Sequence, residues 1–145
     1  MSDCKCFSRD HLLAQGEGWR LQLSKQQGYL GWCLVVLERH AEDGAELTAE
    51  EVVELWDTLR RARAALSTLF EPDHFNYAIL GNVVRHVHMH LMPRYESPRL
   101  FEGHTFRDEH WGWFAIPDPG EAPAEVLEPL AEAMRQELER EGGAS

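Results

Sequence analysis

The chain has little of what disulfide-rich, membrane-spanning and exported proteins usually carry. It contains three cysteines, Cys4, Cys6 and Cys33, which is too few for a disulfide framework. Its longest mostly apolar run, Tyr29 to Leu37, is far shorter than the roughly 20 residues that cross a bilayer. No basic segment followed by an apolar stretch opens the chain, so we expect no secretory signal and a cytoplasmic protein.

Positive charge is scarce as well. Fourteen Lys and Arg face 25 Asp and Glu, and the resulting net charge of −11 opposes binding to nucleic acid or to an anionic membrane. We therefore predict no nucleic-acid partner and no membrane partner. With 145 residues, of which 43% are hydrophobic, the chain has the size and composition of a single globular domain spanning residues 1–145.

Four segments have the composition or the periodicity of β-strands. Trp19 to Leu23 alternates apolar and polar residues as an exposed strand does, and Tyr29 to Leu37 has the composition of a buried strand. Phe75 to Leu80 and the histidine-rich segment from His86 to Met92 are separated by a short loop and predict a β-hairpin. The stretch from Tyr95 to Pro119 has no clear period and is expected to be an ordered loop or short irregular elements.

Two helices are predicted. Thr48 and Glu51 form a capping box, and apolar residues then recur at steps of three and four, which predicts a long amphipathic helix over about Ala49 to Phe70. A second apolar stripe predicts a carboxy-terminal helix over 121–142. Together these elements indicate an α+β fold with an antiparallel sheet of about five strands.

Three histidines dominate the hairpin. His86, His88 and His90 alternate with apolar residues, so Val87, Met89 and Leu91 are expected to face the core while the histidines share the other face. A neutral imidazole is able to attack phosphorus, and flanking imidazoles are able to orient it and to protonate a leaving group.

The loop from Gly81 to Arg85 offers backbone N–H groups and the Asn82 amide to a phosphate. The alternative is a transition-metal site on a cupin-like β-barrel, with the three histidines as ligands. Two long helices disfavour this alternative.

The segment His86-Val87-His88-Met89-His90-Leu91-Met92 resembles the signature of the histidine triad (HIT) family of nucleotide hydrolases and nucleotidyl transferases, in which histidines alternate with apolar residues. The flanking residues 76–82 and 93–95 are similar to those of a bacterial branch of that family. The resemblance covers about residues 27–111 and implies a HIT-like fold and a homodimer joined through the helix and the sheet edge.

The resemblance also implies roles for individual residues. His88 is the nucleophile on the α-phosphate of a nucleoside phosphoramidate or a dinucleoside polyphosphate, and it forms a covalent nucleotidyl-histidine intermediate. His90 contacts the phosphate and assists the leaving group, and His86 orients the other two. Asn76 and Asn82 lie near the phosphate, and no cofactor is implied. Uridylyl-transferring relatives carry glutamine at the third triad position, so His90 favours hydrolysis.

The chain departs from the family pattern at three positions near the triad. Arg85 replaces a common proline, Asn82 replaces a common glutamine, and Trp32 stands where better-known branches have a fourth histidine. Because of Trp32, a nucleotide-binding or regulatory protein without catalysis remains an alternative.

Some relatives bind zinc through a Cys-x-x-Cys pair, the histidine of an upstream turn and the first triad histidine. The corresponding residues here are Cys4, Cys6, His40 and His86. The two cysteines are one residue too close together for that pattern, so we predict no metal site.

Overall fold

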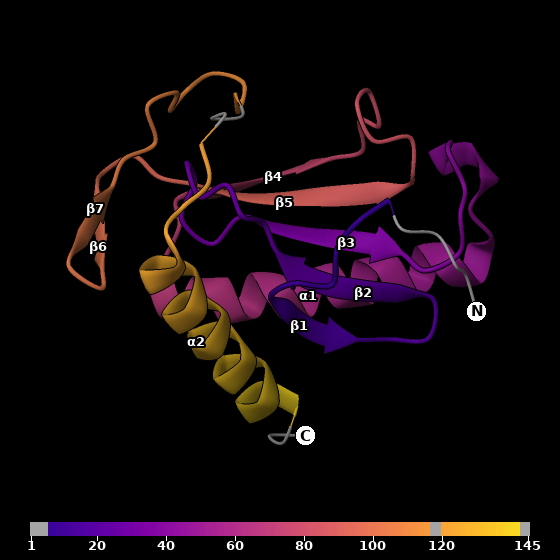
Figure 1. The fold of residues 1–145 in the computed structure, drawn as a ribbon, viewed down its shortest axis with the longest axis horizontal. Helices are drawn as coiled ribbons and strands as arrows, with labels where there is room; N and C mark the ends of the chain where they lie inside the picture. Colours follow the sequence, from indigo (N-terminus) through magenta and orange to yellow (C-terminus); the bar gives the residue numbers. More distant parts are fainter. Residues whose placement is uncertain (1–5, 117–119, 143–145) are drawn as a thin grey trace.

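An open sheet of five antiparallel strands forms the centre of the protein (Figure 1). The structure, a computed structural model, describes residues 6–116 and 120–142. The strands are arranged in the order β1-β2-β3-β5-β4, and every neighbouring pair is antiparallel. Their bounds are β1 (Leu12–Gln15), β2 (Trp19–Leu23), β3 (Cys33–Leu37), β4 (His74–Ala78) and β5 (His88–Arg94). The predicted α+β class and five-stranded sheet are confirmed.

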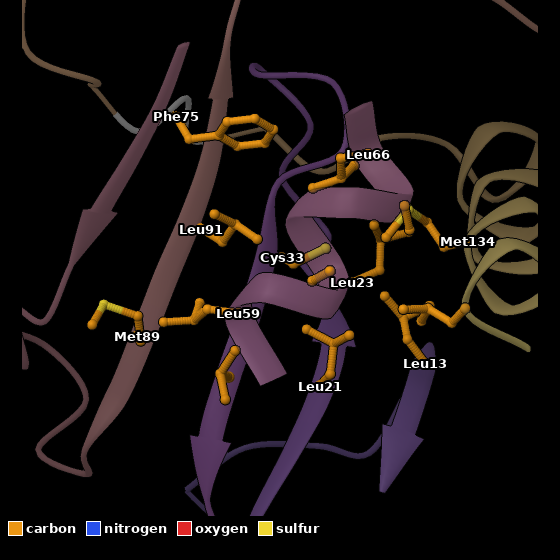
Figure 2. Close-up of a cluster of buried hydrophobic side chains, with 14 of the residues drawn as sticks. Leu13, Leu21, Leu23, Cys33, Leu59, Leu66, Phe75, Met89, Leu91 and Met134 are labelled. Atoms are coloured by element: carbon orange, nitrogen blue, oxygen red, sulfur yellow. The ribbon is translucent and has the colours of Figure 1, made fainter. Parts of the chain in front are cut away.

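Two long helices, α1 (Ala49–Phe70) and α2 (Ala124–Gly142), bury their apolar stripes in one core together with one face of the sheet. Figure 2 shows Leu59 and Leu66 of α1 and Met134 of α2 gathered with Leu21 and Leu91 of the sheet. The helices predicted from the sequence are confirmed, and a short 3-10 helix, η1 (Gly44–Glu46), precedes α1.

The capping box explains why α1 begins where it does. The Thr48 hydroxyl accepts a hydrogen bond from the Glu51 amide at 3.1 Å, and the Glu51 carboxylate accepts one from the Thr48 amide at 2.9 Å. The helix therefore starts with two of its free N–H groups satisfied. An open sheet with two helices on one face is incompatible with a jelly roll, so the alternative of a cupin-like barrel was wrong.

Strand β5 separates the core from the opposite face of the sheet. Val87, Met89 and Leu91 belong to the core cluster, as predicted. His88 and His90 alternate with them and pair across the sheet with β3, opposite Val36 and Leu34. β5 begins at His88, so His86 precedes the strand.

The prediction of an exposed strand at Trp19 to Leu23 was wrong, because all five residues of β2 are buried. Strand β1, which the sequence did not indicate, pairs with the outer edge of β2. The polar side chains of β2 bind protein groups in place of water. Arg20 donates to Glu38 at 2.5 Å and to Gln22 at 2.9 Å. The alternation of apolar and polar residues in β2 therefore marks a buried polar network and not an exposed face.

Two other segments differ from the prediction. Only Cys33–Leu37 of the apolar run is a strand, because the chain turns at Gly31, whose φ of +92° suits glycine. The stretch after Tyr95 contains a hairpin of β6 (Arg99–Phe101) and β7 (His104–Phe106), while residues 117–119 lie outside the described residues.

None of the helices in residues 6–116 and 120–142 combines the length and the apolar character needed to cross a membrane.

Candidate active site

A cavity of about 640 Å³ lies against the sheet face that is turned away from the helices. His88 and His90 line it, together with Trp32 from the turn before β3. Residues 80–84, between β4 and β5, form a second wall, and residues 6–8 form a third. Two histidines of the predicted triad thus share one cavity with the loop that was predicted to bind phosphate.

Charged side chains are few in this cavity. Lys25 is the one Lys or Arg among its described lining residues, and its ammonium lies 3.2 Å from the Asp10 carboxylate, which also lines the cavity. Glu121 adds a second acid to the lining. A phosphate bound here would therefore rely on neutral donors such as imidazole and backbone N–H groups. No sequence pattern around Lys25 or Asp10 pointed to the cavity.

His88 is held in one tautomer by the backbone. Its Nδ1 lies 2.6 Å from the carbonyl oxygen of His86, and because a carbonyl only accepts, Nδ1 carries the proton. The neutral ring then has its lone pair on Nε2. Burial holds the pKa of His88 below its usual value, which favours this neutral form. The geometry presents an imidazole with the electronic form of a nucleophile.

The Phe7 ring packs edge-on against His88, with ring centroids 4.6 Å apart. It contacts His86 in the same way at 5.9 Å. The amino-terminal segment thus covers part of the triad and contributes to its burial. Sequence reasoning missed Phe7, because nothing local to it indicates that the segment folds back over the sheet.

His90 lies beside His88, with ring centroids 4.9 Å apart. Its Nδ1 lies 3.1 Å from the indole nitrogen of Trp32. Burial, and secondarily the charge of His88, lower the pKa of His90 to about 4. His90 is therefore neutral near pH 7. Trp32, which stands where better-known branches of the resembled family have a fourth histidine, thus contacts His90.

His86 has a different position from the other two histidines. It is 3% exposed and is absent from the cavity lining. Its Nε2 donates to the Leu37 carbonyl at 2.6 Å, and its own carbonyl accepts the hydrogen bond from His88. His86 therefore contacts His88 through its backbone carbonyl and not through its ring.

Cys6, His40 and His86 bring three ligand atoms within 4.8 Å of one another. The two Nδ1 atoms are 3.2 Å apart, and Cys6 Sγ lies 3.9 Å from His40 Nδ1. Tetrahedral zinc sets N···N near 3.3 Å and N···S near 3.6 Å, roughly what these pairs show. The His86 Nε2–H bound to a carbonyl is the outer hydrogen bond that zinc-ligating histidines usually make. These three residues fit a zinc ion, and Cys4 lies outside the described residues.

The two asparagines that were predicted to lie near the phosphate occupy different places. Asn82 lines the cavity within the loop that begins at Gly81, whose φ of +67° suits glycine. Asn76 is absent from the cavity lining, and its side-chain oxygen accepts a hydrogen bond from Arg94 at 2.6 Å.

Arg94 fastens the 108–113 segment to the sheet. Its guanidinium pairs with Asp108 at 2.7 Å and donates to the carbonyls of His110 and Trp113. Hydrogen bonding to Arg94 helps to hold the pKa of Asp108 below its usual value, against the opposing effect of burial. Asn76 is one more partner in this network, so the structure places it in support of a loop.

The open sheet, the helices on one face and the paired histidines on the other define an α+β domain of histidine-triad type. The family model described as HIT domain matches residues 9–97, and the chain belongs to the HIT family.

Several known proteins are similar to this chain. An uncharacterised HIT-like protein of Mycoplasma genitalium is 30% identical over 76 residues, which are 49% of this chain and about half, 54%, of that relative's length. The structure is similar to that of a hypothetical histidine triad nucleotide-binding protein from Sulfolobus tokodaii, with a TM-score of 0.70, 19% identity, and coverage of 90% of this chain and 84% of the other. It is also similar to a zinc-bound histidine triad family protein from Mycobacterium smegmatis, with a TM-score of 0.66, 21% identity, and coverage of 93% and 88%.

Proposed function

We propose that this protein hydrolyses a nucleoside phosphoramidate or a dinucleoside polyphosphate at the α-phosphate, through a covalent intermediate on His88. The observation that carries the proposal is the hydrogen bond from His88 Nδ1 to the His86 carbonyl, since it leaves the Nε2 lone pair for the substrate. The cavity and the family membership support a nucleotide as the ligand.

The reaction has two steps. His88 Nε2 attacks the α-phosphorus and the bond to the departing group breaks while the His90 Nε2–H donates a hydrogen bond to that group. A phosphate leaves as an anion, and an amine leaves with a proton taken up from solvent. Water then attacks the nucleotidyl-histidine, the bond between phosphorus and nitrogen breaks with its electron pair returning to His88 Nε2, and the proton of the water passes to solvent. A nucleoside monophosphate leaves, and both imidazoles return to their starting forms.

Turnover of adenosine phosphoramidate and of diadenosine polyphosphates by the wild type and by His88→Asn tests this function. We expect release of adenosine monophosphate by the wild type and none above background with the variant. His74→Asn is the matched control, because His74 is exposed at the far end of β4 and should not affect turnover. Nucleotide binding without turnover in the wild type would favour the regulatory alternative, and neither binding nor turnover would reject a nucleotide function.

We also infer that Cys6, His40 and His86 hold a structural zinc ion, which the distances between their ligand atoms favour. A related structure from Mycobacterium smegmatis is described as zinc-bound. Such an ion would tie the amino-terminal segment to the residue that orients His88. Elemental analysis of purified protein tests the inference: we expect about one zinc per chain, lost in Cys6→Ser, and a metal-free wild type would contradict it.

We propose that the protein forms a homodimer through α1 and the edge strand β4. Val52 and Trp56 of α1 and Ile79 after β4 are large apolar side chains exposed by 36–40%, and the Trp56 ring contacts Tyr77 of β4. This surface is continuous with the edge of the sheet. Light scattering after gel filtration should give twice the chain mass for the wild type and the chain mass for Trp56→Glu. A monomeric wild type would reject the dimer.

A further inference from the structure

The contact between Trp32 and His90 restricts the protonation of His90. The indole nitrogen of Trp32 is a donor and has no lone pair to offer, so at 3.1 Å it must donate to His90 Nδ1. A neutral imidazole carries one proton, and with Nδ1 acting as acceptor the proton is on Nε2. A histidine in place of Trp32 would impose no such choice, because its ring nitrogens are able to donate or accept.

Trp32 is held firmly enough to impose this choice. It is 3% exposed, and Tyr29, which is 2% exposed, packs on it with ring centroids 5.8 Å apart. The buried Gln27 amide closes the turn, accepting from the Gly31 amide at 2.7 Å and donating to the Trp32 carbonyl at 3.0 Å. The indole is thus fixed at its ring and at its backbone.

The two cavity histidines then have opposite tautomers. His88 donates from Nδ1 to a carbonyl and keeps its lone pair on Nε2. His90 accepts at Nδ1 and keeps its proton on Nε2, which has no hydrogen-bond partner among the residues that the structure describes. A nucleophile needs the first arrangement, and a donor to a phosphoryl oxygen or leaving group needs the second.

We propose that Trp32 is a positioning residue that holds His90 as the Nε2–H tautomer, so that a donor faces the substrate's phosphoryl group and leaving group. This inference rests on the proposed hydrolase function. It gives Trp32 a defined role in the site. Because the described residues that line the cavity include two carboxylates and one ammonium, an oriented neutral donor matters more here than in a basic pocket.

Nitrogen NMR of the full-length protein, labelled with ¹⁵N in histidine and tryptophan, tests the hydrogen bond without substrate. We expect a coupling across the hydrogen bond between Trp32 Nε1 and His90 Nδ1, and nitrogen shifts of His90 that identify Nε2 as the protonated atom. Spectra of His90→Gln and Trp32→Phe assign the two signals. A wild-type His90 that carries its proton on Nδ1 would overturn the inference, even if neither variant folds.

Kinetics of Trp32→Phe test the positioning role. Loss of one hydrogen bond predicts a fall in kcat of about 5- to 10-fold with KM little changed, together with loss of the nitrogen coupling. Trp113→Phe, at a tryptophan that is 68% exposed, is the matched control and should change neither kcat nor the nitrogen coupling. An unchanged kcat in a folded Trp32→Phe that has lost the coupling would overturn the role. Absence of turnover in the wild type would instead reject the proposed hydrolase function, and the NMR result would still decide the tautomer.

Discussion

The two faces of strand β5 differ in the kind of contact that their side chains make. On the core face, Met89 and Leu91 pack among other apolar side chains, where size and shape decide the fit. On the cavity face, His88 and His90 each bind one particular group: the His86 carbonyl and the Trp32 indole. Periodicity alone places residues on a face, whereas partners from distant segments set the chemical state of the histidines.

This difference predicts that substitutions on the two faces have separable effects. Changes on the core face should lower the stability and leave the chemistry of the folded protein intact. Changes on the cavity face should impair the chemistry and leave the stability nearly unchanged.

The largest effect is expected from Leu91→Ala on the core face. Leu91 is 0% exposed, and truncating a buried leucine lowers the free energy of unfolding by about 2–5 kcal/mol. Urea unfolding measures this loss, and kcat per folded molecule should stay within about twofold of the wild type. Leu100→Ala, at a leucine that is 72% exposed, is the matched control and should change stability by less than about 0.5 kcal/mol. A large loss of kcat in folded Leu91→Ala would break the separation.

His90→Gln tests the cavity face. Glutamine keeps an oxygen that can accept from Trp32, but its amide does not place an N–H where the ring Nε2–H of His90 lies, so turnover should fall by about 10²- to 10³-fold. Thermal unfolding should change little, because the side chain is half-buried and Gln preserves its hydrogen bond. Wild-type turnover in this variant would show that the hydrogen bond from His90 Nε2–H is not needed for catalysis.

The two asparagines give a smaller contrast. Asn82 lines the cavity, so Asn82→Ala should raise KM about tenfold by removing one hydrogen bond to a charged phosphate. Asn76→Ala should leave KM unchanged and lower the stability by about 1 kcal/mol, because Arg94 loses an acceptor. Steady-state kinetics and urea unfolding of both variants separate these outcomes. An equal KM change in both would place Asn76 in substrate binding after all.

The smallest expected effect is on stability in acid, and it comes from Glu51 in helix α1. Hydrogen bonding to Arg39 lowers the pKa of Glu51 to about 2, from an unfolded value near 4.5. Stability from Glu51 is therefore complete above pH 4.5 and is lost as the pH falls toward 2. The loss should be no more than about 1 kcal/mol, since Arg39 is partly exposed. Urea unfolding across this range should show a shallower decline in Glu51→Gln, and an identical pH dependence would contradict the assignment.

Local signals made part of this protein predictable from its sequence. The capping box and apolar stripe predicted α1 with its observed bounds, and the alternation in β5 predicted which side chains enter the core. These features depend on residues close together in the chain, which is why they could be read without a structure.

Other features depend on contacts between distant segments. The β6–β7 hairpin turns at Glu102 and Gly103, both with positive φ, and Arg99 anchors it to the carbonyl of Phe70 at the end of α1. The burial of β2 depends on its pairing with β1 and on Glu38. The contact of Trp32 with His90 joins residues 58 positions apart, so the sequence showed an unusual residue without showing what it touches.

The most direct test of the central claim is intact-mass spectrometry of the protein mixed with adenosine phosphoramidate and quenched in alkali within one turnover. The account predicts an added mass of one adenosine monophosphate on the wild type, located on His88 by peptide sequencing and absent from His88→Asn. An adduct on another residue, or rapid release of adenosine monophosphate by His88→Asn, would contradict it.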